Sequence, residues 1–187
     1  MVHIILVGQM GSGKTTLANV LSNDYGYERW PSMTTRPPRP GEVDGYDYIF
    51  VDDEAFTASD AYGYITGVRE YETVHGLWRY GFPVHPVPET DTVSILDPRG
   101  LMDVYDKIPD IYPVFMDVDP DVCRYRAMAR GDDLLEIERR MKSDQEDFYE
   151  FSQVYQDFCK LRIKQARTPQ EDAERVIRYI RKEKHHE

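Results

Sequence analysis

The sequence has few of the features that mark membrane, secreted or metal-bound proteins. Its two cysteines, Cys123 and Cys159, lie far apart without metal-type spacing, so we expect free thiols with no role in function. No apolar run approaches the roughly 20 residues that span a bilayer. The N-terminus also lacks the basic segment and long apolar run of a signal peptide. These absences predict a cytoplasmic protein with no membrane partner.

Positive charge is also scarce. The chain has 23 Lys and Arg against 34 Asp and Glu, a formal net charge of −11. A polyanion requires a positive surface, so nucleic acid is not an expected partner. A small anionic substrate is still compatible with this composition, because arginines cluster locally at 36 and 39, at 124, 126 and 130, and at 139 and 140.

The chain begins with an order typical of phosphate-binding proteins. His3 to Val7 is an apolar run that predicts a buried strand, and Thr15 to Asn23 has apolar residues at helical spacing. Between them, residues 8–15 match G-x-x-x-x-G-K-S/T, the ATP-binding phosphate loop. Its glycines let backbone N–H groups converge on phosphate oxygens at a helix N-terminus. The expected ATP-binding residues are Gly8, Gln9, Met10, Gly11, Ser12, Gly13, Lys14, Thr15 and Thr16.

The phosphate loop predicts phosphoryl transfer, which depends on positioning and charge neutralisation. Lys14 is expected to reach the β- and γ-phosphates, and the Thr15 hydroxyl to ligate Mg²⁺. Additional arginines are expected around the transferred group. Arg126 and Arg130 recur on one predicted helix, and Gly131 follows as a flexible break, so residues from about 124 to 140 are predicted to form a lid. For Arg124 a solvated helix face is the competing interpretation.

The remaining pattern predicts a single domain of the α/β class with an inserted lobe. Residues of about 32–83 are rich in Pro, Gly and aromatic side chains, which favours loops and short strands over helices. Elsewhere strands alternate with helices, so the core of 1–31 and 84–187 is predicted to be a three-layer P-loop kinase fold with a mostly parallel sheet. The predicted elements are strands at 92–96, 111–118 and 161–163, and helices at 101–105, 121–130, 134–158 and from 169 onward.

The lobe contains a second candidate phosphate site. Arg36 and Arg39 lie three residues apart in a loop stiffened by prolines, with the hydroxyl of Tyr48 nearby in sequence. Two guanidinium groups on a rigid loop form a clamp for a dianion. A donor site and an anion clamp in one short chain indicate transfer of phosphate to a phosphorylated acceptor.

The run from Ser32 to Phe50 closely resembles the monophosphate-binding segment of guanylate kinases, S-x-T-T-R-x-x-R-x-G-E-x-x-G-x-x-Y-x-F. The resemblance implies that Arg36, Arg39 and Tyr48 hold the acceptor phosphate. It also implies that Ser32 lies near the base and that Glu42 helps to organise the metal and phosphates. GMP or dGMP is therefore the favoured acceptor, with Mg-ATP as donor and a monomer or homodimer as the expected state.

Three shorter matches extend the resemblance. The run A-R-G-D-D-L-L-E-I-E-R-R-M resembles the family lid, which implies that Arg130 and Arg140 contact ATP phosphates. Tyr80 with the glycine after it resembles the Y-G that precedes closure of the base pocket. Asp97 matches the first aspartate of L-D-x-D, although a helix N-cap is its alternative role.

The sequence departs from the family where the base is read. Thr66 aligns with the guanine-reading glutamate, and Phe82 aligns with a small hydroxyl residue. Glu70 or Glu72 is a candidate for a replacement carboxylate. The second strand-end aspartate is missing after Asp97, and no asparagine marks the adenine pocket near residue 165. A polar pocket discriminates between bases only when its polar groups are in place.

These departures leave three alternatives to a kinase for GMP or dGMP. The first is a kinase for another deoxynucleoside monophosphate or one with a modified base. The second is a ribose bisphosphate phosphokinase, which has the same phosphate loop but a sugar phosphate as acceptor. The third is a non-catalytic module that binds phosphopeptides, but such modules typically have a degraded phosphate loop, and here Gly13, Lys14 and Thr15 are all present.

Overall fold

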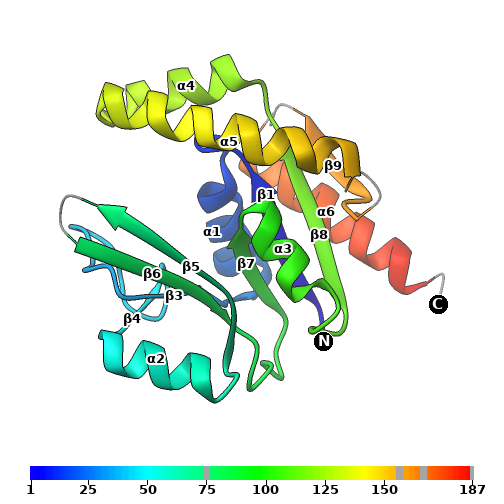
Figure 1. The fold of residues 1–187 in the computed structure, drawn as a ribbon. Coiled ribbons are helices and arrows are strands. Elements are labelled where there is room, and N and C mark those ends of the chain that lie inside the picture. The colour runs from blue at the N-terminus through cyan, green and yellow to red at the C-terminus, as the bar shows by residue number, and fades with distance from the viewer. Residues whose placement is uncertain (74–75, 155–157, 165–167, 186–187) are drawn as a thin grey trace.

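A computed structural model describes residues 1–73, 76–154, 158–164 and 168–185. Its centre is a parallel sheet (Figure 1). Within these ranges five strands lie in the order β2-β7-β1-β8-β9 and pair in parallel. They are β1 (His3–Gly8), β2 (Glu28–Arg29), β7 (Thr92–Leu96), β8 (Ile111–Asp117) and β9 (Leu161–Lys164). Every residue of β1 is buried, as its apolar run predicted.

Helices cover both faces of this sheet. Because successive side chains of a strand point to opposite faces, Ile4 and Leu6 of β1 pack with α1 (Lys14–Tyr25) and α6 (Pro169–Lys184). Ile5 and Val7 pack on the other face with side chains of α3 (Pro98–Tyr105) and α5 (Leu134–Val154). The predicted three-layer α/β fold is confirmed.

Two predicted helices have different limits in the structure. Helix α3 begins at Pro98 and not at Leu101, because the Asp97 carboxylate accepts a hydrogen bond from the Gly100 N–H at 2.6 Å and a proline occupies the first turn. The helix predicted at 121–130 is α4 (Pro120–Ala129). The helix predicted to reach 158 is described to Val154, and residues 155–157, like residue 165 near the expected adenine pocket, lie outside the described ranges.

The inserted lobe is a small mixed sheet with one helix on its outer face. Its strands lie in the order β4-β3-β6-β5, with β3 parallel to β4 and antiparallel to β6. Helix α2 was not predicted, although Asp52 caps it by accepting from the Ala55 N–H at 2.8 Å and Phe56 anchors it in the interior. The elements are β3 (Met33–Thr34), β4 (Ile49–Phe50), α2 (Asp53–Ala61), β5 (Ile65–Thr73) and β6 (Gly76–Pro83).

The lobe and the α4–α5 pair extend from the same side of the core, to the left in Figure 1, with the start of α1 between them. This arrangement places the phosphate loop, at the carboxyl end of β1, between the two extensions. Open α/β sheets bind ligands at the carboxyl ends of their strands. Among the described residues, no helix combines the length and apolar character needed to cross a membrane.

Candidate functional site

The phosphate loop depends on glycine at two positions. Gly11 and Gly13 have φ values of +76° and +96°, in the left-handed region that favours glycine. A Cβ at Gly11 would lie 2.3 Å from the carbonyl oxygen of Cys123 in α4, so the loop packs directly against that helix. Gly13 is the N-cap of α1, and its carbonyl accepts from the Leu17 N–H at 3.0 Å. The loop therefore delivers the chain into the N-terminus of α1, as its motif predicted.

Lys14 lies over its own loop. Its Nζ donates to the carbonyl oxygens of Gly8 at 2.5 Å and Gln9 at 2.8 Å. Burial lowers the pKa of the Lys14 ammonium to about 8, although the nearby Asp144 carboxylate acts to raise it. A phosphate group bound beside this ammonium would add negative charge and favour its protonated form.

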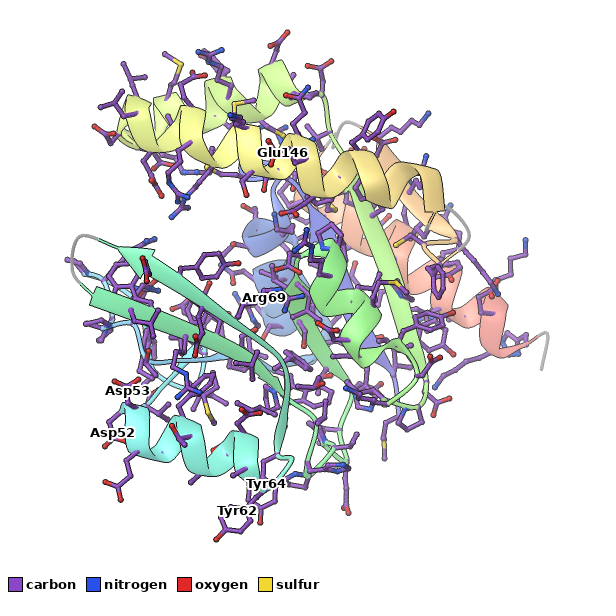
Figure 2. All side chains as sticks on the ribbon, in the orientation of Figure 1. Asp52, Asp53, Tyr62, Tyr64, Arg69 and Glu146 are labelled. Atoms are coloured by element: carbon purple, nitrogen blue, oxygen red, sulfur yellow. The ribbon has the colours of Figure 1, made fainter. Side chains whose placement is uncertain are left out.

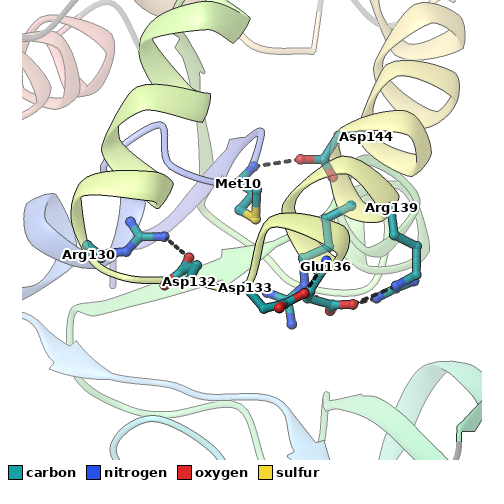
Figure 3. Close-up of polar contacts among 8 residues, drawn as sticks. Met10, Arg130, Asp132, Asp133, Glu136, Arg139 and Asp144 are labelled. Carbon is teal, nitrogen blue, oxygen red and sulfur yellow. Dashed lines mark hydrogen bonds and ion pairs between the residues drawn. The ribbon is translucent and has the colours of Figure 1, made fainter.

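Two of the predicted lid arginines lie near this loop, and the other two pair with glutamates of α5. Arg126 is close, with Nη1 at 3.9 Å from the point where a Cβ would stand on Gly13. Arg130 is near enough for its charge to lower the pKa of Lys14, and it pairs with Asp132 at 2.7 Å (Figure 3). Arg140 donates to Glu136 at 2.6 Å, within α5. Arg124 pairs with Glu138 across α4 and α5, so it joins the two helices.

Asp144 of α5 is a loop contact that the sequence analysis missed. Its carboxylate accepts a hydrogen bond from the backbone N–H of Met10 at 2.6 Å (Figure 3). Burial raises the pKa of Asp144, while the Met10 N–H and Lys14 act to lower it. No motif in the sequence marks this residue, because its contact spans 134 positions.

The predicted anion clamp is assembled around a buried arginine. Arg36 is 3% exposed and pairs with Glu42 at 2.8 Å. Burial acts to lower the pKa of Arg36, but hydrogen bonds with Glu42 and Tyr80 raise it above its usual value. The Arg36 guanidinium also lies 5.2 Å from the ring centroid of Tyr48. The structure thus brings Tyr80 of β6 together with three residues of the loops beside β3 and β4, which are Arg36, Glu42 and Tyr48.

Arg39 completes the clamp in a different way. Its side chain is exposed, and its backbone N–H donates to Glu42 at 2.6 Å. Burial acts to raise the pKa of Glu42, but the hydrogen bonds from Arg36 and Arg39 hold it below its usual value. An ionised Glu42 therefore fixes both arginines, one through its side chain and one through its backbone.

A cavity of about 320 Å³ lies between the phosphate loop and the predicted acceptor segment. Thr15 of the donor loop lines it together with Ser32 and Tyr48 of the acceptor segment. Arg29, which the sequence analysis did not select, also lines it and donates to Asn19 at 3.0 Å. Its other lining residues are Trp30, Pro31, Glu42, Asp47 and Ile95.

The two positions expected to read the base are neighbours in the lobe sheet. Thr66 is half-buried and stands opposite Phe82 across the β5–β6 pair. Phe82 is 3% exposed and its ring lies 4.9 Å from that of Trp30, so it fills the interface of lobe and core. Thr66 is hydrogen-bonded to Lys107. Asp97 caps α3, which was the alternative role for it.

Comparisons with known proteins identify the family. The family model for guanylate kinase matches residues 1–74. A guanylate kinase of Lactiplantibacillus plantarum is 35% identical over 148 residues, 74% of this chain and 69% of that protein. One from Latilactobacillus sakei is 36% identical over 149 residues, 74% and 71% of the two chains. The chain belongs to the guanylate kinase family.

Two further comparisons bear on extent and fold. A guanylate kinase of Leifsonia xyli is 37% identical over 119 residues, which is 60% of this chain and 46% of that protein. The crystal structure of guanylate kinase from Anaplasma phagocytophilum superposes with a TM-score of 0.67 at 24% identity, over 97% of this chain and 85% of that one. The predicted family, the fold and the enzyme class, a guanylate-kinase-type nucleoside monophosphate kinase, are confirmed.

Proposed function

We propose that this guanylate-kinase-family protein transfers the γ-phosphate of Mg-ATP to the phosphate of GMP or dGMP. The observation that supports this most directly is the cavity that Thr15, Ser32, Glu42 and Tyr48 line together. Thr15 of the phosphate loop lies on one side of this cavity and Glu42 and Tyr48 of the acceptor segment on the other, so the cavity offers a space in which two phosphate groups can meet. Transfer between bound phosphates requires that proximity.

In the proposed reaction, an oxygen of the acceptor phosphate forms a bond to the γ-phosphorus, and the bond to the β,γ-bridging oxygen breaks to release ADP. Arg36, Arg39 and Tyr48 hold the acceptor phosphate and so orient the attacking oxygen. Charge that develops on the transferred group is neutralised on the donor side. The residues proposed for this are Lys14, Arg126, Arg130 and Arg140.

The lobe of about 32–83 and the lid of about 124–140 are proposed to close over the two substrates. Arg140 supports this motion, since it is held by Glu136 at 2.6 Å and would have to exchange that partner for an ATP phosphate. Ser32 is proposed to lie near the base and Tyr80 to accompany Tyr48, whose ring centroid is 6.0 Å from its own. Closure excludes water, which strengthens the charged contacts inside.

Magnesium is the implied metal, and the residues present fit it. The Thr15 hydroxyl is exposed at the start of α1, and the carboxylates of Glu42 and Asp47 line the same cavity. Oxygen ligands of this type suit Mg²⁺, which usually binds through few protein groups together with substrate phosphates. When bound, Mg²⁺ would neutralise negative charge on the ATP phosphates. Thr15 is the proposed ligand.

The test is formation of ADP from Mg-ATP with each ribo- and deoxynucleoside monophosphate and with ribose phosphates as acceptors. We expect ADP formation with GMP or dGMP, and none when a chelator removes the magnesium. ADP formation with a ribose phosphate and no nucleotide would instead support a ribose bisphosphate phosphokinase. No ADP above background with any acceptor would rule out the proposed reaction.

A further inference from the structure

One face of the lobe sheet continues from the anion clamp toward α3. In the antiparallel pair of β5 and β6, Arg69 stands opposite Tyr80, and directly opposed residues share a face. Tyr71, two residues further, lies on the same face, and its ring centroid is 5.6 Å from that of Tyr80. Tyr80 in turn contacts Arg36 of the clamp. A nucleotide whose phosphate is held at Arg36 therefore has Tyr80, Tyr71 and Arg69 along this face.

The two glutamates considered as replacement base readers lie on the other face. Glu70 pairs with Arg79 at 3.2 Å, and the Arg79 guanidinium stacks 4.4 Å from the ring centroid of Phe56 in α2. By strand alternation Glu72 shares the face of Glu70. Neither carboxylate points toward the clamp. The β5 side chain directly opposite Tyr80 is a cation, Arg69.

Arg69 is aimed by a break in the strand. The register of β5 against β6 shifts between Thr66 and Arg69, and Gly67 within this bulge has a φ of +63°. A Cβ at Gly67 would lie 2.6 Å from Oδ2 of Asp103, so only glycine allows the strand to approach α3 this closely. Bulges of this kind redirect side chains near functional sites. Figure 2 shows Arg69 between the hairpin and α3.

Carboxylates hold the redirected guanidinium in place. Nη2 of Arg69 lies 2.9 Å from Asp103 and 3.5 Å from Asp97, and Nη1 donates to the Gly67 carbonyl at 2.6 Å. A guanidinium has five N–H donors. Among the described residues, the two hydrogen bonds to Asp103 and Gly67 engage two of these donors, and the side chain is 21% exposed. Arg69 is therefore rigid and keeps donors for a ligand.

We propose that Arg69 reads the base of the acceptor, an inference that rests on the proposed function. A guanidinium only donates hydrogen bonds, so it recognises a base edge with adjacent acceptors. O6 and N7 of guanine are such an edge, and adenine offers only N7 with a donor beside it. Asp97 and Asp103 are positioning residues that hold Arg69 toward this edge. The pocket selects guanine through O6 and N7 and not through its 2-amino group.

Acceptor analogues test this reading on the unaltered protein. GMP and IMP share O6 and N7, and IMP lacks only the 2-amino group. We expect their kcat/KM values to agree within about threefold, and those of AMP and 7-deaza-GMP to be about 10- to 100-fold lower. A strong preference for GMP over IMP, with 7-deaza-GMP used as well as GMP, would overturn the proposal.

Variants separate base reading from a structural tie between lobe and core. Arg69→Gln should lower kcat/KM for GMP and IMP about 10- to 100-fold while AMP is unchanged or improved, because glutamine suits adenine N6 and N7. Arg69→Lys retains the charge beside Asp103 but loses the planar fork, so it should lose the same preference. Arg79→Gln makes the same substitution on the opposite face and should alter all acceptors by one common factor.

These experiments distinguish failure of the role proposed for Arg69 from failure of the proposed reaction. Wild-type protein that forms no ADP with any monophosphate contradicts the reaction itself. Active wild-type protein whose GMP to AMP ratio is the same in Arg69→Gln, Arg69→Lys and Arg79→Gln contradicts the role of Arg69 alone. KM and kcat should be measured separately for each acceptor, since a base reader acts on acceptor use and leaves the KM for ATP unchanged.

Discussion

The donor and acceptor sides of the cavity are built differently. The donor loop is one uninterrupted run from Gly8 to Thr15, and Lys14 contacts backbone atoms of that run. The proposed acceptor site draws on the β3–β4 loop, which lines the cavity, and on the β5–β6 hairpin and α3, which are joined by pairs such as Arg69 with Asp103, 34 residues away. The donor loop itself is thus contiguous in sequence, whereas the proposed acceptor site depends on how the lobe packs on the core. The two sides should respond separately to substitution.

The largest effect is expected where the lobe packs on the core. Phe82→Ala removes a ring that is 3% exposed and lies against Trp30, so the free energy of unfolding should fall by about 3–5 kcal/mol. Chemical denaturation measures it, with exposed Tyr62→Ala as the control. Under conditions where the variant is folded, acceptor KM should rise while ATP affinity is unchanged. An equal loss of ATP affinity would show that the two sides are not separable.

Substitution of Lys14 is the most direct way to impair the donor side. Lys14→Ala should lower kcat on the order of 10²–10³-fold, because the lysine stabilises charge on the transferred phosphoryl group. Since this contribution does not involve the base, the factor should be the same for every acceptor. Steady-state rates with several acceptors measure it, and Lys182→Ala on the exposed side of α6 is the control. Different factors for different acceptors would argue against a purely donor role.

Arg39 provides the corresponding test of the acceptor side. Its side chain is exposed, so Arg39→Ala should leave stability unchanged. Loss of a charge-assisted hydrogen bond to the acceptor phosphate should raise the acceptor KM about 10- to 100-fold. Exposed Arg178→Ala in α6 is the matched control. Equal losses in ATP and acceptor binding would contradict the assignment of Arg39 to one side.

The smallest expected effect is the pH dependence of ATP affinity. Burial lowers the pKa of Lys14 to about 8, so the ammonium loses its proton above that pH in the free protein. Bound phosphates favour the ammonium, so ATP affinity should fall about tenfold between about pH 7 and about pH 9. Titration calorimetry should detect proton uptake on binding in the same range. The dependence should vanish in Lys14→Met and should be absent from acceptor binding.

The same titration affects the free protein with a defined sign. The unfolded chain keeps its Lys14 proton up to its usual pKa of 10.5, whereas the folded chain loses it near 8. Between these values the unfolded state binds more protons, so this group makes the free energy of unfolding rise with pH. Denaturation of wild type and Lys14→Met across this window measures the difference. A fall with pH that is specific to Lys14 would contradict burial as the cause of the shift.

Much of the fold followed from local patterns. The phosphate loop, the apolar strands and the closing helix were predicted near their observed limits, because glycine spacing and hydrophobic periodicity are local properties. Helix α2 was missed, although Asp52 and the acidic residues after it are an N-cap signal. The start of α3 was placed late because the cap at Asp97 was not used. The roles of the clamp and lid residues are predictions that the experiments above address.

The base pocket shows where local information ends. Thr66 and Phe82 stand opposite each other across the β5–β6 pair, but this pairing and the burial of Phe82 could not be known from sequence. Glu70 and Glu72 were candidate base readers because the register of β5 was unknown. A shift of one residue exchanges the two faces of a strand. The bulge at Gly67 decides that register, and no motif marks it.

Sequence alone identified the phosphate-loop motif and the family and predicted an anion clamp, since each of these depends on residues close together in the chain. Tertiary structure decided which side chains lie beside the proposed acceptor site. It placed Glu70 against Arg79 and buried Phe82 between the lobe and the core. It also brought Arg69 to Asp97 and Asp103. The physical reason is that strand register and helix packing set these neighbours through contacts distant in sequence, and such contacts leave no local pattern.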